Sequence, residues 1–217
     1  MFCLRFVDGE LLWQIDTNVR FGVVQNFFGV GSTPIIEDEL LIAAIGGSPA
    51  TPHANLLAAQ GEVVGNGSAL VAFNKLSGEI VYQSGDELAS YASPTIVDMN
   101  GRRQGFYFAR GGLMGFDPNT GRVNLHYPWK SRKLESVNAS NPVIVDDRVF
   151  ISESYGMGTS LLKVGEDGYA VLWQDGPRVR KKRMELHWNT AIYHDGYLYG
   201  CHGRGASSAA LRAVNLE

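Results

Sequence analysis

The sequence has little that would direct the chain to a membrane, a nucleic acid or a metal. No run approaches the ~18 consecutive apolar residues of a membrane-spanning helix, and the first residues lack the basic-then-apolar layout of a signal peptide. A formal net charge of −3 gives no overall field that attracts nucleic acid or an anionic membrane. Cys3 and Cys201 lie far apart and form no zinc or redox motif. We therefore expect no transmembrane segment, no nucleic acid partner and no metal site.

Helical periodicity and catalytic motifs are also missing. The apolar runs are short, rich in β-branched residues and bounded by Gly and Asp, with no stripe at i, i+3, i+4 and i+7, so we expect no helix. No Gly-x-Ser-x-Gly elbow, phosphate loop or His-Glu-x-x-His motif occurs. The 217 residues are 45% hydrophobic, which is enough to bury a sizeable core as one domain.

An internal repeat is the main feature that the sequence does have. A hairpin pattern with an acidic or Gly-containing turn occurs four times, at anchors Pro34, Pro94, Pro142 and Thr190, which are 60, 48 and 48 residues apart. A second hairpin follows the first three copies, with turns at Ser77-Gly78, Thr120-Gly121 and Asp167-Gly168. Two hairpins make a four-stranded antiparallel sheet, and such units repeated at about 48 residues are typical of β-propeller blades.

We therefore predict an all-β fold, a β-propeller with about four to four and a half four-stranded antiparallel blades. Residues 1–217 form one segment, with a partial blade at 1–15 and blades at about 30–84, 91–128, 138–175 and, incomplete, 187–217. Because the repeats begin and stop inside hairpins, we expect a fragment of a larger propeller. Its open edges would then pair with the remaining blades or with another copy.

Residues 72–82 (AFNKLSGEIVY) and 115–122 (GFDPNTGR) are similar to the A-x-D-x-x-T-G-x-x-x-W signature, so the chain resembles the PQQ-like (pyrroloquinoline quinone) β-propeller repeat family. Asn74 replaces the signature Asp, Tyr82 replaces the Trp, and Leu125 stands at the second Trp position. The family includes quinoprotein dehydrogenases and a non-enzymatic propeller lipoprotein of outer-membrane assembly. This resemblance implies the periplasm or the cell surface.

Pyrroloquinoline quinone and calcium are implied only by the dehydrogenase branch of that family. Those enzymes look like eight-bladed rings with a disulfide between adjacent cysteines and a calcium held by Glu, Asn and Asp. The sequence has no adjacent cysteines, so no cofactor is evident. The family resemblance therefore predicts the fold better than the cofactor.

One end of the predicted blades carries a candidate binding site. In an antiparallel blade, the loop between the second and third strands and the connection to the next blade lie at the same end. Seven side chains suited to a polar ligand or a peptide fall there: Tyr91, Arg110, Asn138, Glu153, Trp188, His202 and Arg204. The alternative is that they are ordinary rim residues that satisfy loop backbone groups.

Two further segments fall at the same end. The insertion at 46–67 is interpreted either as a lid or as a decoration of its loop. The basic run Arg178, Arg180, Lys181, Lys182 and Arg183 is interpreted as a solvated loop, because it lacks a broad basic surface and stacking aromatics.

The preferred hypothesis is a non-catalytic platform that binds a protein partner or a small polar ligand. The alternative is a fragment of a quinone-dependent alcohol or sugar dehydrogenase. A carbohydrate-active propeller ranks last, because it needs paired carboxylates and only Glu153 is placed to contribute.

Overall fold

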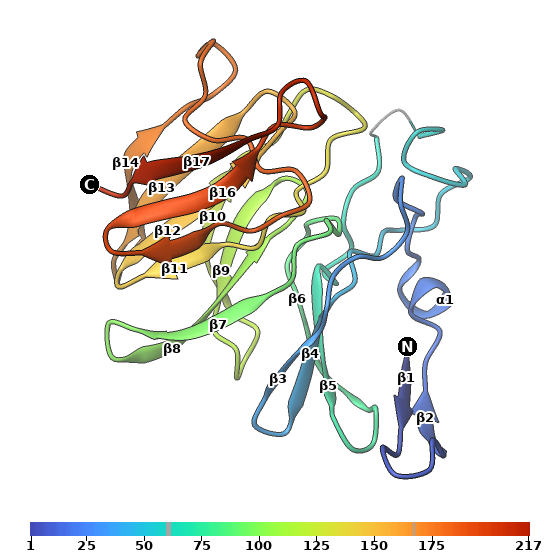
Figure 1. Ribbon diagram of the computed structural model, residues 1–217. Coiled ribbons are helices and arrows are strands. Elements are labelled where there is room, and N and C mark those ends of the chain that lie inside the picture. Colours follow the sequence, from blue (N-terminus) through green and yellow to red (C-terminus); the bar gives the residue numbers. More distant parts are fainter. Residues whose placement is uncertain (60–61, 167) are drawn as a thin grey trace.

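The computed structural model describes residues 1–59, 62–166 and 168–217. In this part of the chain the strands form five antiparallel sheets, which follow one another along the chain from β1–β2 to β15–β17 (Figure 1). Three sheets have four strands, one has three and one has two. The predicted all-β fold is confirmed, and the sheets form an open, partial propeller.

The bounds of the elements follow the repeat. The first hairpin consists of β1 (Phe2–Leu4) and β2 (Leu11–Gln14). The first complete blade contains β3 (Ile35–Glu37), β4 (Leu40–Ala44), β5 (Leu70–Asn74) and β6 (Ile80–Ser84). The second contains β7 (Thr95–Met99), β8 (Arg102–Phe108), β9 (Gly112–Phe116) and β10 (Val123–Pro128). The third contains β11 (Val143–Val145), β12 (Arg148–Glu153), β13 (Gly158–Val164) and β14 (Tyr169–Gln174). The last sheet contains β15 (Ile192–His194), β16 (Tyr197–His202) and β17 (Ala210–Asn215).

Tight turns connect the first two strands of each blade. Asn100 and Gly101 both have positive φ (53° and 74°), as do Asp195 and Gly196 (45° and 82°). Two consecutive residues with positive φ match the right-handed twist of the flanking strands, and Asn, Asp and Gly tolerate this conformation best. These turns hold the hairpins in the register that the sequence predicts. Of the predicted Asp167-Gly168 turn, Asp167 lies outside the described residues.

The departures from the family signature keep its hydrogen bonds. Asn74 Oδ1 accepts from the backbone N–H groups of Leu76 and Ser77, at 3.0 Å each. Asp117 Oδ1 accepts the equivalent bonds in the next blade, from Asn119 and Thr120. An amide oxygen can therefore serve this turn as well as a carboxylate oxygen does.

Aromatic side chains dock the first hairpin onto the first complete blade and that blade onto the second. Trp13 Nε1 donates to the carbonyl of Lys75 at 3.2 Å, and the Trp13 ring covers Gly78. The Tyr82 hydroxyl donates in the same manner to the carbonyl of Pro118 at 2.8 Å, and its ring covers Gly121. Tyr82 thus occupies the signature Trp position and makes an equivalent contact between blades.

The hydrophobic core lies between neighbouring blades. One cluster joins the first and second complete blades through residues such as Ile42, Leu70, Tyr107 and Phe116, all fully buried. Similar clusters join the second blade to the third and the third to the last sheet. Each blade therefore buries both faces only when its neighbours are present, as expected of a propeller.

The prediction that the chain has no helix is wrong at one place. Helix α1 (Thr17–Phe21) follows the first hairpin, with Asp16 Oδ1 accepting from Val19 N–H at its start and Gly22 in the left-handed conformation at its end. A capped helix of five residues is too short to show a periodic apolar stripe. Within the described residues, no helix has the length and apolar character needed to cross a membrane.

Candidate functional site

Trp188 lies at the centre of an aromatic cluster built by three connections between blades. Its ring centroid is 5.1 Å from that of Tyr91, 5.5 Å from that of Phe28 and 5.3 Å from that of His187. The Phe28 backbone N–H also donates to the Tyr91 hydroxyl at 2.8 Å. Trp188 remains 49% exposed and Phe28 63% exposed, so two large aromatic side chains are held in place and still face solvent.

Loops within blades reach the same cluster. Tyr155 follows β12, and its hydroxyl lies 3.0 Å from Nε2 of His187. The Arg204 guanidinium, which follows β16, lies 4.0 Å from the centroid of the Tyr155 ring. Burial, and secondarily Arg204, lower the pKa of His187, which favours the neutral ring beside Tyr155. Both kinds of loop thus meet at one end of the blades, and we call the exposed Phe28, Trp188 and Arg204 together with the half-buried His187 the aromatic surface.

Arg110 and Asn138 support this surface from below. The buried Arg110 guanidinium donates to the carbonyls of Ser136 (3.1 Å) and Leu134 (2.5 Å). Asn138 Nδ2 donates to the carbonyl of Ala109 at 2.7 Å, while its backbone carbonyl accepts from Tyr91 N–H at 3.1 Å. Both residues fix the connection between β10 and β11, on which Tyr91 rests.

Glu153 is engaged in its own loop, and His202 holds the connection between β14 and β15. The Glu153 carboxylate is fully buried and accepts from the backbone N–H groups of Tyr155 and Met157. Burial raises its pKa, while these backbone donors act in the opposite direction. His202 Nδ1 accepts from Glu185 N–H at 2.9 Å.

Of the seven predicted site residues, the structure therefore leaves only Trp188 and Arg204 exposed. The other five are buried at this end of the blades: Tyr91, Arg110, Asn138, Glu153 and His202. Sequence reasoning missed Phe28, Tyr155 and the contribution of His187. The only available signal was an aromatic pair, Phe27-Phe28, in a segment without strand pattern, and such a pair does not reveal its distant partner.

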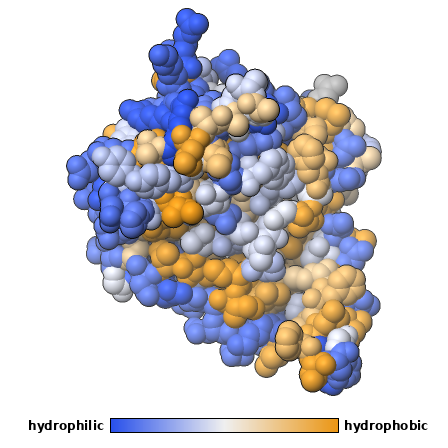
Figure 2. Space-filling view, in the orientation of Figure 1, coloured by the Kyte–Doolittle hydropathy of each residue, from blue (hydrophilic) through white to orange (hydrophobic). Residues whose placement is uncertain are grey.

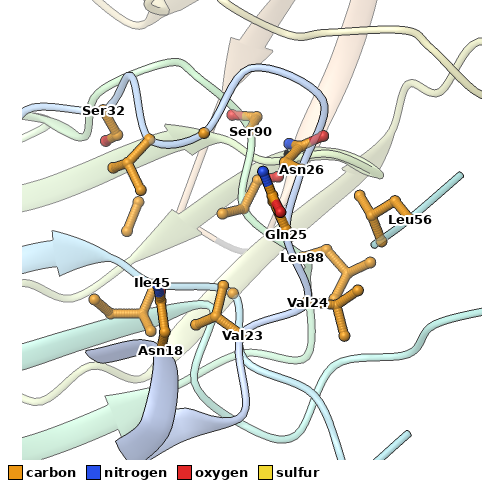
Figure 3. Close-up of a pocket in the computed structure, with 15 residues that line it drawn as sticks. Asn18, Val23, Val24, Gln25, Asn26, Ser32, Ile45, Leu56, Leu88 and Ser90 are labelled. Atoms are coloured by element: carbon orange, nitrogen blue, oxygen red, sulfur yellow. Dashed lines mark hydrogen bonds between the residues drawn. The ribbon is translucent and has the colours of Figure 1, made fainter. Parts of the chain in front are cut away.

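The insertion at 46–67 packs beside this surface and contributes Gly46 and Leu56 to the lining of a small pocket (Figure 3). Its Leu56 is buried, and Asn55 forms a parallel bridge with Gln25. The pocket has a volume of about 160 Å³ and is lined by Val23, Leu56 and Leu88 together with the amides of neighbouring Asn and Gln side chains. Residues 60 and 61, in the middle of the predicted lid, lie outside the described residues.

The predicted basic run separates into structural and exposed cations. Arg183 forms an ion pair with the buried Asp175 at 3.1 Å, and Lys182 Nζ donates to the carbonyl of Gly176. These two side chains fold the loop between β14 and β15 back on itself. Arg178, Arg180 and Lys181 are exposed, and no carboxylate of the described residues lies within 4 Å of them.

The side chains at this end do not fit a calcium ion of the kind that the dehydrogenase resemblance implies. Calcium takes six to eight oxygen ligands, usually from several carboxylates. In the described part of the chain, no three His, Cys, Asp or Glu side chains converge on one point. The oxygens of Glu153 are committed to backbone donors instead.

Comparisons with known proteins agree with this architecture. A family model described as outer membrane protein assembly factor BamB matches residues 1–199. The crystal structure of BamB from Moraxella catarrhalis superposes with a TM-score of 0.56 at 13% identity, over 96% of this chain and 49% of the other. An α-L-arabinofuranosidase from Clostridium thermocellum gives a TM-score of 0.38 at 14% identity, over 90% of this chain and 70% of the other. No curated protein matches the sequence. The chain thus spans about half the length of the BamB structure.

Proposed function

The chain belongs to the family of outer membrane protein assembly factor BamB, and from this membership we propose that it is a non-catalytic platform whose aromatic surface binds a protein partner. The likeness to a solved BamB structure supports the fold of such a platform. The name of the family points to the assembly of outer membrane proteins as the process in which this chain takes part. The periplasm or the cell surface is then the expected place of action.

The observation that carries the proposal is that Trp188 is both fixed in position and exposed. Three aromatic neighbours hold its ring, yet nearly half of the residue is exposed. Tryptophan is enriched among the residues that dominate binding at protein interfaces, and a side chain already fixed in position loses little entropy when a partner binds. Exposed Phe28 extends the apolar area, and Arg204 supplies forked donors at its edge.

The chemistry of the surface favours binding over catalysis. The titratable groups in and beneath it make structural contacts: His187 is hydrogen-bonded to Tyr155, and the buried Glu153 accepts from backbone N–H groups. A glycoside hydrolase needs carboxylates that face its substrate, whereas the Glu153 carboxylate is fully buried and accepts from backbone N–H groups. A fixed aromatic surface with a cationic edge suits a peptide segment or the side of a folded domain.

Site-specific crosslinking tests the proposal. The photoreactive aromatic residue p-benzoylphenylalanine would replace Phe28, which is 63% exposed, in cells of the organism that encodes the chain. We expect light-dependent crosslinks to a component of outer membrane protein assembly. The matched control is Leu76, which is 70% exposed in the β5–β6 turn at the opposite end of the blades.

Two results would count against the platform. One is equal crosslinking to that component from positions 28 and 76, which would show no preference for the aromatic surface. The other is the absence of any crosslink from position 28 while the protein is present and folded. With the component identified, Trp188→Ala should weaken its binding to the purified chain at least tenfold, since central aromatic anchors contribute about 2 kcal/mol or more.

A further inference from the structure

Six exposed basic side chains stand on two consecutive connections between blades, at the end that carries the aromatic surface. They are Lys130, Arg132 and Lys133 after β10, and Arg178, Arg180 and Lys181 after β14. Among the described residues, no carboxylate lies within 4 Å of any of them. We call this group the basic rim. It holds six of the 19 Lys and Arg residues of a chain whose net charge is −3.

The two connections are neighbours in space because both are anchored to the turn between β12 and β13. Ser131 Oγ donates to the carbonyl of Tyr155 at 2.8 Å, which ties down the first connection. Gly176 N–H donates to the carbonyl of Met157 at 2.8 Å, which ties down the second. Tyr155 also carries the aromatic contacts to His187 and Arg204. The basic rim and the aromatic surface are therefore built on the same turn.

Charges from the two connections act on a common carboxylate. Burial raises the pKa of Glu185, while Lys182 and Lys133, one from each connection, and Arg212 lower it. Lys182 and Arg183 make contacts within their own loop, whereas Arg178, Arg180 and Lys181 of the same loop do not form ion pairs in the described part of the chain. The loop projects at the top of Figure 1, and the same projection is hydrophilic in Figure 2.

Resting on the proposed platform function, we infer that the basic rim binds an acidic segment of the protein partner, whose neighbouring apolar residues contact the aromatic surface. Unpaired like charges on adjacent loops repel one another and gain most from a ligand that supplies several carboxylates. Arg favours carboxylates because its guanidinium can donate two parallel hydrogen bonds to one of them. An extended acidic segment can reach both connections at once.

The rest of the molecule favours a short acidic segment over a nucleic acid or a membrane. The opposite end of the blades carries exposed acidic residues in its turns, including Asp38, Asp146 and Asp195. Because surface charges are screened beyond roughly 8–10 Å at physiological salt, the rim attracts only the part of a polyanion that lies on it, so a long nucleic acid gains little over a short acidic segment. Around the three rim cations of the second connection, within residues 176–183, Val179 is the one exposed large apolar side chain of the described chain, which offers little for insertion into a bilayer.

Fluorescence anisotropy with a labelled deca-glutamate peptide tests the inference. We expect saturable binding at low salt that weakens as salt is added, and no binding of deca-glutamine. Arg178→Gln/Arg180→Gln/Lys181→Gln should weaken deca-glutamate binding about tenfold, because three exposed charge pairs are lost. The matched control, Arg20→Gln/Arg122→Gln/Lys163→Gln, removes the same charge elsewhere and should change affinity less than twofold.

The design separates this inference from the platform proposal. A second peptide carries a tryptophan at the centre of the glutamates. Trp188→Ala should reduce only the extra affinity that this tryptophan provides, while the triple rim variant should weaken both peptides. If the wild-type chain binds both peptides equally, or if Trp188→Ala leaves the extra affinity of the tryptophan peptide unchanged, the aromatic platform is contradicted while the rim remains supported.

Three outcomes would overturn the inference. The first is the absence of deca-glutamate binding by the folded wild-type chain. The second is equal weakening by the rim and control triples, which would show a diffuse charge effect. The third is tighter, rim-dependent binding of single-stranded DNA or of phosphatidylglycerol vesicles, which would assign the rim to a nucleic acid or a membrane.

Discussion

Glu37 and Arg103 form a bidentate ion pair across the first two complete blades: Arg103 Nε donates to Oε1 and its NH2 group to Oε2, both at 2.7 Å. Glu37 ends β3, whereas Arg103 lies in β8 of the next blade. Two parallel hydrogen bonds fix the relative position of these strands in a way that apolar contacts alone do not. The pair lies at the end of the blades opposite the aromatic surface.

We expect Glu37→Gln to lower the free energy of unfolding by about 1 kcal/mol at neutral pH, since the pair is partly exposed. The Arg103 hydrogen bonds hold the pKa of Glu37 below its usual value. The stabilisation is thus full above the unfolded pKa of about 4.3 and is lost as the pH falls through the lower folded pKa. Urea unfolding of both proteins at pH 7 and near pH 3 checks this. A difference that persists unchanged in acid would contradict the assignment.

Gly46 lies two residues after the end of β4, against the connection between β6 and β7. A Cβ at this position would lie 1.9 Å from Ala89 N, and the residue has a φ of +63°. We expect Gly46→Ala to lower the free energy of unfolding by about 3 kcal/mol or more, because the backbone near Ala89 must move and residue 46 must also keep a strained positive φ. Gly9→Ala is the control: its φ is +74° but its surroundings are open, so only about 1 kcal/mol should be lost. Equal losses by thermal or urea unfolding would refute the packing argument.

The fold was predictable because it rests on local signals that recur. Asn100-Gly101 and Asp195-Gly196 specify tight turns by themselves, and the alternation of such turns with short apolar runs defines the blade. The departures at Asn74 and Tyr82 do not disturb this pattern, because Asn74 makes the turn bonds that Asp117 makes in the next blade and Tyr82 makes a contact like that of Trp13. Because the sequence repeats, a hairpin recognised in one unit is expected at the same place in every other unit.

The candidate site was only partly predictable because its members meet through tertiary packing. The sequence places Trp188 and Arg204 at the correct end of the blades, but it does not show that Phe28 covers Trp188 or that Tyr155 lies under Arg204. It also cannot distinguish an arginine that faces solvent from Arg110, which turns inward to loop carbonyls. Helix α1 was missed because two capping residues, and no periodic pattern, define it.

His187 gives the site a pH dependence. Burial, then Arg204, lower its pKa in the folded chain, so the unfolded chain binds more protons below about pH 6.5. The stability that the neutral ring provides is therefore present above that pH and is lost as the pH falls toward the folded pKa. We expect the free energy of unfolding to decrease between pH 7.5 and 5.5, and His187→Gln to reduce this decrease. Urea unfolding at several pH values is the measurement, and an unchanged slope in the variant would exclude His187 as a source.

Arg110 and Arg204 have different roles at the site: Arg110 supports it from within, and Arg204 forms part of its exposed surface. Arg110 is 7% exposed, and its guanidinium satisfies the carbonyls of Ser136 and Leu134. Arg110→Ala leaves these acceptors without a partner and creates a cavity, so we expect a loss of about 3 kcal/mol in the free energy of unfolding. Arg204 is exposed and stacks on Tyr155, a contact that contributes about 0.5–1 kcal/mol.

Arg204→Ala should therefore leave the melting temperature almost unchanged and reduce the affinity for the protein partner. Arg110→Ala should lower the melting temperature by several degrees, because the connection that carries Lys130, Arg132 and Lys133 loses its anchor. Its effect on binding should then be greatest near the lowered melting temperature and small in the cold. A large loss of affinity by Arg110→Ala at 4 °C, with the fold intact by circular dichroism, would mean that Arg110 contacts the partner directly.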